Sequence, residues 1–253
     1  MQKREPLLTE QHFDKAIQRQ ERMIRETEED VLLPPGEVVM HVAYLVLFRA
    51  LRKSLVLKYS RGYPLDELKQ LFPAVVVALE GCRYHPDPQG GDLFFNGEQD
   101  EYMQAVALLS LGLLLRVEAG VFQRLVAALG LNGQDFVLEW LAGRRLPDRP
   151  QPTQLLFPKT YARLRDAIQA PRDIQAVVLR GFLSSWYESL DTVWYNIHAH
   201  RADAAGFTGY WCWEAAAVAC FLGVDDGELR ALRYYPADLA DYALGRQPAP
   251  PTA

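Results

Sequence analysis

Apolar side chains recur at helical spacing along nearly the whole chain. One face of the segment from Thr9, a candidate N-cap, to Asp30 is apolar and the other is charged; the apolar face comprises Phe13, Ile17, Met23 and Ile24. The largely apolar stretch 37–60 predicts a long buried helix that ends at Arg61-Gly62. No stretch alternates apolar and polar residues over the length of a strand, so the pattern predicts an all-α protein.

Turn-forming residues separate the remaining helices. Pro64 begins a helix that is expected to continue through the apolar run 74–79, and a loop rich in Gly, Pro, Asp and Asn follows at 81–97. Residues 143–158 hold four prolines, which is typical of a domain linker. We therefore expect a packed bundle of two helical subdomains, 1–144 and 158–245. The later expected helices are 98–116, 118–129, 133–142, 159–169, 172–190, 208–222 and 226–232, with a short one from Ala237.

The net charge of −5 resides in the C-terminal third. Residues 1–181 carry 23 Lys+Arg and 23 Asp+Glu, whereas residues 182–253 carry four Arg, no Lys and nine acids. Phosphate binding needs clustered Lys and Arg, so we expect no direct nucleic-acid binding by this region. An acidic surface suits a basic protein partner, although a mild negative charge also serves solubility alone.

Composition places the chain among ordinary globular proteins, with 49% hydrophobic and 23% charged residues. The longest apolar runs are far shorter than the roughly 20 residues that a bilayer-spanning helix needs. The N-terminal residues lack the apolar region of a signal peptide. Three cysteines without CxxC spacing fit neither a disulfide framework nor a zinc knuckle. These features predict a cytoplasmic protein that does not enter a membrane.

Few residue patterns indicate catalysis. His198 and His200 are two positions apart and would chelate a metal only from an extended segment; the carboxylates that would complete such a site are Asp203, Glu214, Asp225 and Asp226. This spacing matches no metal motif, and residues 223–230 lack the ligand positions of an EF-hand. The sequence contains no GxSxG, P-loop or GxGxxG motif. We therefore expect no enzyme activity and no cofactor.

Glu214 stands out because the helix expected over 208–222 is otherwise apolar. Its apolar stripe comprises Trp211, Ala215, Val218 and Leu222, widened by Trp213, Ala217 and Cys220. A carboxylate there needs polar partners or takes up a proton. Hydrogen bonds from Trp or Tyr side chains would satisfy Glu214, and a catalytic role is the alternative. Cys212 and Cys220 are expected to be buried small side chains.

Aromatic residues gather upstream of that helix. The pairs Trp186-Tyr187 and Trp194-Tyr195 are eight residues apart, so on one helix they would face roughly the same way. His198 would pack against Trp194 one turn away if the segment is helical. Such aromatics usually build core or a ridge between helices.

These motifs together resemble the C-terminal domain of the PoNe immunity proteins (PoNi), whose partners are polymorphic nuclease effectors. Relative to the family pattern, Trp213 replaces Phe, Val224 replaces Ile, and a glycine follows the two aspartates. The stretch LVLKYSRGYPLDELKQLF (55–72) is similar to the N-terminal domain of the family. The residues that carry the C-terminal resemblance are Trp186, Tyr187, Trp194, Tyr195, His198, Gly209, Tyr210, Trp211, Glu214, Asp225, Asp226, Tyr235 and Pro236.

The resemblance implies a cytoplasmic antitoxin that binds a cognate DNase toxin domain and blocks DNA cleavage. It further implies that the toxin is of the PD-(D/E)xK type and is exported by type VI or other bacterial secretion systems. A nuclease presents positive surface to phosphates, and an acidic inhibitor could occupy that surface. Our hypothesis for the toxin-binding carboxylates is Asp203, Asp225, Asp226, Glu228, Asp238 and Asp241.

Other interpretations stay open at this point. Asp225 or Asp226 would serve equally well as a helix cap, and the loop 81–97 is an alternative toxin contact. A helical adaptor without a toxin partner, or a metal-dependent hydrolase using His198, Glu214 and Asp226, would also fit the residues. The sequence is compatible with a homodimer as well as with a monomer.

Overall fold

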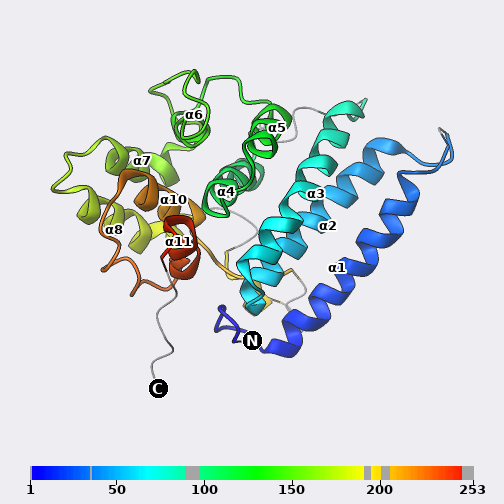
Figure 1. Cartoon of the computed structure of the whole chain (residues 1–253), viewed down its shortest axis with the longest axis horizontal. Coiled ribbons are helices and arrows are strands. Elements are labelled where there is room, and N and C mark those ends of the chain that lie inside the picture. Colours follow the sequence, from blue (N-terminus) through cyan, green and yellow to red (C-terminus); the bar gives the residue numbers. More distant parts are fainter. Residues whose placement is uncertain are drawn as a thin grey trace. The chain divides into compact units, whose positions relative to one another are not determined.

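The computed structural model describes residues 2–34, 36–88, 90, 97–190, 195–200 and 206–246. Eleven α-helices, one short 3₁₀-helix and no β-strand occur in these residues, which confirms the all-α prediction (Figure 1). The chain divides into two compact units. Unit 1 comprises Met1–Asn96, Ala127–Leu129 and Asn196–Tyr210, and unit 2 comprises Gly97–Val126, Gly130–Tyr195 and Trp211–Ala253.

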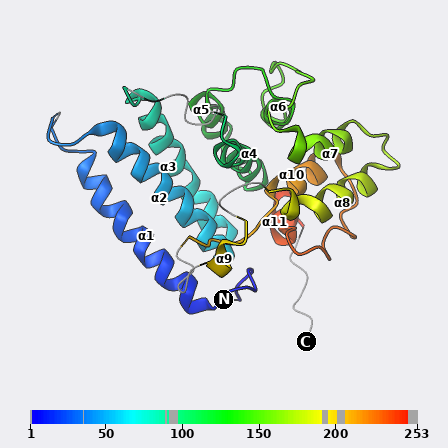
Figure 2. The ribbon, with the colours of Figure 1, turned by 180° about the vertical axis from the view of Figure 1, so that it is seen from behind.

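Three long helices run side by side in unit 1: α1 (Glu10–Asp30), α2 (Met40–Arg61) and α3 (Leu65–Tyr84) (Figures 1 and 2). The Thr9 hydroxyl accepts a hydrogen bond from the His12 amide at 3.2 Å, so the predicted N-cap of α1 is confirmed. Phe13 and Ile17 are buried, but Met23 is 39% exposed. Thr27 is buried instead. Its hydroxyl donates to the Met23 carbonyl, so burial leaves no unpaired polar group.

Gly62 ends α2 as predicted, and the structure shows why a glycine stands there. Its φ is +102°, and a Cβ atom at this position would lie 2.1 Å from the Gln2 carbonyl oxygen. The helix α3 then passes through Pro73 and the apolar run 74–79, as expected. It continues to Tyr84, four residues into the predicted loop, because Arg83 donates to the carbonyls of Ala128 and Leu129.

The segment before Trp211 belongs to unit 1 and is held by hydrogen bonds rather than by a helix. The short α9 (Ile197–His200) precedes it and is labelled in Figure 2. The Ser60 hydroxyl donates to the Thr208 carbonyl at 2.5 Å, and the Tyr210 amide donates to buried Glu5 at 3.1 Å. The helix predicted from about Thr208 therefore begins only at Trp213.

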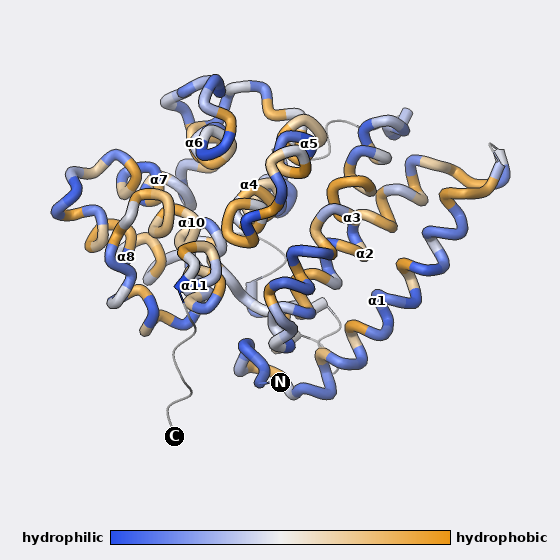
Figure 3. Tube along the Cα trace, in the orientation of Figure 1, coloured by the Kyte–Doolittle hydropathy of each residue, from blue (hydrophilic) through white to orange (hydrophobic). Residues whose placement is uncertain are grey.

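Unit 2 is built around α10 (Trp213–Leu222), so the apolar helix expected over 208–222 is central in this unit. It contacts α4 (Gln99–Leu114), α7 (Pro158–Gln169), α8 (Gln175–Trp186) and α11 (Ala237–Leu244). The side chains of Ala215, Ala216, Ala217 and Ala219 are at most 1% exposed, so neighbouring helices approach closely. In Figure 3 α4 is hydrophobic along most of its length, as a buried helix should be, whereas α1 is mainly hydrophilic.

Two predicted helices of unit 2 are shorter or absent. The helix expected over 172–190 is α8, followed by the 3₁₀-helix η1 (Tyr187–Ser189). The helix expected over 226–232 is a series of turns, although the Arg230 amide still donates to the Asp226 carbonyl at 3.1 Å. The glycine after the two aspartates and the side-chain hydrogen bonds of Asp226 favour the turn.

The proline-rich segment 143–158 lies within unit 2, between α6 (Phe136–Gly143) and α7; α5 (Ala119–Leu129) precedes α6. Buried Asp135 anchors this segment: its carboxylate accepts from the amides of Leu138 and Leu156 and from the Tyr102 hydroxyl, at 2.8 to 2.9 Å. The division of the chain into domains 1–144 and 158–245 stays a proposal.

Candidate functional site

The acidic segment of unit 2 is organised by a network of ion pairs. Asp226 is 4% exposed, and its carboxylate accepts hydrogen bonds from Arg230 at 3.0 Å, Tyr235 at 3.0 Å and Arg246 at 3.2 Å. Burial alone would raise the pKa of Asp226, but the hydrogen bonds from Arg230 and Tyr235 outweigh burial and lower it. Asp226 is therefore a charged anchor inside the unit.

Arg230 joins the turn region to α11. Its guanidinium donates to both carboxylate oxygens of Asp241, which is 14% exposed, as well as to Asp226. The hydrogen bonds with Asp241 and then Asp226 raise the pKa of Arg230. This bidentate arrangement fixes where the loop 223–236 lies against α11.

The other predicted toxin-binding carboxylates are exposed, half-buried or outside the described residues. Asp225 is exposed and accepts from the Gly227 amide at 3.1 Å, which makes a turn rather than a helix cap. The Glu228 side chain is 77% exposed and lies 3.5 Å from Arg180. Asp238 is half-buried in the first turn of α11, where its carboxylate accepts from the Leu239 amide. Asp203 lies outside the described residues.

A tyrosine stack lies beside this loop. Tyr187 stacks on Tyr195 with ring centroids 4.9 Å apart and on Tyr234 at 5.0 Å, and Arg233 lies over the Tyr234 ring. Tyr195 is 44% exposed. The expected proximity of residues 187 and 195 is thus present, although α8 ends at Trp186. Trp194, its predicted neighbour in the motif, lies outside the described residues.

Glu214 is 3% exposed and has the structural partner that was expected. The Trp186 indole N–H donates to its carboxylate at 2.8 Å. Burial raises the pKa of Glu214 to about 7, and the hydrogen bonds from its own backbone amide and from Trp186 limit that rise. The neighbouring Cys212 is fully buried, as predicted, and its burial raises the pKa of the thiol. Cys220 was also expected to be buried but is half-buried.

Gly209 and Tyr210 of the motif belong to unit 1. Gly209 has a φ of +116°, which only glycine adopts readily. The Tyr210 hydroxyl lies 3.0 Å from His198 Nδ1, and both rings contact Phe207. His198 is therefore part of an aromatic cluster of unit 1; its expected contact with Trp194 involves a residue outside those described.

The residues of the hydrolase interpretation serve different local structures. His198 belongs to unit 1, whereas Glu214 and Asp226 belong to unit 2 and have separate partners there. Among the described residues, no three His, Cys, Asp or Glu side chains form a group that could hold a metal ion. None of the described helices combines the length and apolar character that a membrane span requires.

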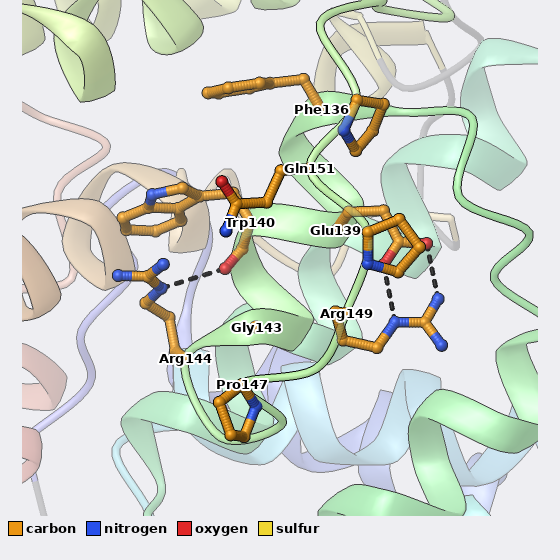
Figure 4. Close-up of a pocket in the computed structure, with 10 residues that line it drawn as sticks. Phe136, Glu139, Trp140, Gly143, Arg144, Pro147, Arg149 and Gln151 are labelled. Atoms are coloured by element: carbon orange, nitrogen blue, oxygen red, sulfur yellow. Dashed lines mark hydrogen bonds and ion pairs between the residues drawn. The ribbon is translucent and has the colours of Figure 1, made fainter.

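A cavity of about 250 Å³ in unit 2 was not anticipated from the sequence (Figure 4). Its wall is Trp140, with the Arg144 guanidinium 4.3 Å from the ring centroid, and prolines of the segment 143–158 complete the rim. Buried Glu139 and half-buried Arg149 form a bidentate ion pair at 2.5 to 2.7 Å that fixes one side of the cavity. The four-residue spacing of Trp140 and Arg144 is the sequence signal that could have predicted their contact at the end of α6.

Comparisons with known proteins agree on the fold and the family. The family model "PoNe immunity protein (PoNi), N-terminal" matches residues 4–127, and "PoNe immunity proteins (PoNi), C-terminal" matches residues 133–239. The crystal structure of protein PA2201 from Pseudomonas aeruginosa superposes with a TM-score of 0.77 at 19% identity, over 96% of this chain and 91% of that one. No curated protein matches the chain significantly. The two family matches span nearly the whole chain, and the protein belongs to the PoNe immunity protein (PoNi) family.

Proposed function

We propose that this protein protects its producer by binding the nuclease domain of a cognate PoNe toxin and blocking DNA cleavage in the cytoplasm. The observation that carries the proposal is the match of both halves of the chain to the immunity family. The toxin in this proposal is a DNase of the PD-(D/E)xK type, exported by a type VI or another secretion system. The immunity protein acts by binding, without catalysis and without a cofactor.

The surface proposed to meet the toxin is the loop 223–236 with its exposed carboxylates. A DNA-cleaving domain exposes positive charge, and Asp225 and Glu228 place negative charge on the surface of unit 2. Asp238 and Asp203 extend the proposed contact. Asp226 and Asp241 contribute by holding Arg230, which keeps the loop in place before the toxin arrives.

The tyrosine stack supplies the uncharged part of this proposed contact. Exposed tyrosines and arginines are frequent energetic centres of protein interfaces because they bury large areas with few rotatable bonds. Tyr195 belongs to the stack and Arg233 lies over the Tyr234 ring, and both residues are exposed. Carboxylates beside such a stack would attract a basic surface and then pack against it.

The double variant Asp225→Lys/Glu228→Lys is expected to bind the toxin about tenfold more slowly at low salt, because exposed charges act chiefly through steering. The difference should shrink at high salt, where these charges are screened. Association rates with a cleavage-inactive PoNe nuclease domain, measured at two ionic strengths, check this. Asp148→Lys, at an exposed position of the proline-rich segment, is the control. Equal rates for the double variant and the control would place the contact elsewhere.

A further inference from the structure

The end of the α1–α2 pair in unit 1 exposes apolar side chains that the fold does not use. Leu32 is 84% exposed, Val39 58%, Val42 48% and Leu33 39%. We call these four residues the apolar tip; Figure 3 shows hydrophobic positions on both sides of the turn between the two helices. Exposed leucines and valines are common singly, but four within eleven residues around one turn form a surface suited to binding.

Acidic residues flank the apolar tip along the chain. No Lys or Arg occurs between Arg25 and Arg49, while the same stretch holds Glu26, Glu28, Glu29, Asp30 and Glu37. Four of these carboxylate residues are exposed and Asp30 is half-buried. Within the described part of the chain, none of the five forms an ion pair with a Lys or Arg side chain.

Folding does not account for this charge. Glu28, Glu29 and Asp30 occupy the last turn of α1, where the helix dipole favours cations, and that turn holds no basic residue. The carboxylates thus stand at the unfavourable end of the helix, next to apolar side chains left in water. A partner with positive charge would compensate the carboxylates at this end of the helix, and its apolar surface would remove the exposed leucines and valines from water.

We propose that the apolar tip is a second contact surface for the basic nuclease domain of the toxin. This inference rests on the proposed function, and charge complementarity selects the occupant: a DNA-cleaving domain has the cationic surface that the acidic rim matches. The leucines and valines supply the apolar centre of the contact, and the carboxylates form its polar rim. Residues of the N-terminal family domain then contribute to toxin recognition alongside the loop 223–236.

Two double variants test the proposal with the intact protein and a cleavage-inactive PoNe nuclease domain as the probe. Leu32→Ser/Val39→Ser is expected to raise Kd at least tenfold, mainly through faster dissociation. Glu28→Lys/Glu29→Lys is expected to slow association about tenfold at low salt and less at high salt. All four positions are exposed, so thermal unfolding should be nearly unchanged.

Matched controls come from other exposed positions. Ile174→Ser/Val177→Ser removes side chains of comparable exposure at α8, and Asp148→Lys/Asp173→Lys makes the same charge change in unit 2. Unchanged binding in the controls, with weakened binding in the tip variants, supports the proposal. Tip variants that bind like the wild type overturn it and leave the proposed function standing. A wild-type chain that binds no nuclease domain overturns both.

Light scattering of the free protein tests the remaining alternative, in which a second copy of this chain covers the apolar tip. If the wild type is a dimer that Leu32→Ser/Val39→Ser converts to a monomer, a second copy covers the apolar tip and the toxin contact is overturned. A wild type that is monomeric alone, with tip variants that weaken the nuclease complex, is the expected result.

Discussion

Replacing Arg230 by methionine is expected to lower the free energy of unfolding by about 3 kcal/mol at neutral pH, because two largely buried carboxylates lose their shared cation. The side chains of Asp226 and Asp241 are 5% and 14% exposed, and Arg230 donates hydrogen bonds to both. Among the described residues, Arg246, whose side chain is 49% exposed, is the one cation left within 4 Å of these carboxylates, and Asp226 keeps its hydrogen bond from Tyr235. Urea denaturation of the variant and the wild type measures the difference.

The pH dependence of the loss in unfolding free energy of Arg230→Met identifies its cause. The pKa of Asp226 is lowered in the folded protein, so its stabilising contribution is present above the unfolded pKa and is lost as pH falls through the folded one. The deficit of Arg230→Met should therefore shrink in acid. Arg233→Met is the matched control, because Arg233 is exposed and, among the described residues, lies over the Tyr234 ring without an ion pair. Equal losses in the two variants would contradict the network described above.

The variant Glu214→Gln is expected to remove a decrease in stability that the wild type shows between about pH 4.5 and pH 7. The unfolded carboxyl releases its proton near 4.5, whereas burial raises the folded pKa to about 7. In this range the folded state binds more protons, so rising pH favours unfolding. A shift of this size corresponds to about 3 kcal/mol, and a neutral amide in the same place avoids it.

Unfolding free energies measured from pH 4 to pH 8 test this directly. Trp186→Phe serves as the comparison because it removes the indole N–H that donates to Glu214. Without that donor the folded pKa should rise further and the decrease in stability should extend to higher pH. Parallel curves for the wild type and Glu214→Gln would show that folding leaves the pKa of Glu214 unchanged, which would contradict the raised pKa.

Periodicity was sufficient to predict most helices of this protein, because their apolar faces carry the signal. It failed where hydrogen bonds from distant residues decide the backbone. Residues 208–212 read as helix, yet the Cys212 amide donates to the Tyr234 carbonyl and the Tyr210 amide to Glu5. Neither partner is visible from a local pattern, so the start of α10 was predicted five residues too early.

The roles of the carboxylates were equally hidden in the sequence. Asp226 and Arg230 are four residues apart, which is a readable signal, but Asp241 joins them only through the packing of α11. The Trp186 partner of Glu214 is 28 residues away in the sequence. The sequence could predict that a Trp or Tyr side chain donates to Glu214, but not which one. Charge counting locates an acidic region, whereas the structure distinguishes the ion-paired Asp226 and Asp241 from the exposed Asp225 and Glu228.

The most direct test of the central claim is a plasmid-cleavage titration with the active nuclease domain of the PoNe toxin proposed as the partner. As immunity protein is added, cleavage should fall steadily and reach background near one equivalent, because a tight complex inactivates one nuclease per inhibitor. Asp225→Lys/Glu228→Lys should need an excess to reach the same end point. Cleavage that proceeds unimpeded at a large excess of folded wild-type protein would contradict the claim that this chain is the inhibitor of that nuclease.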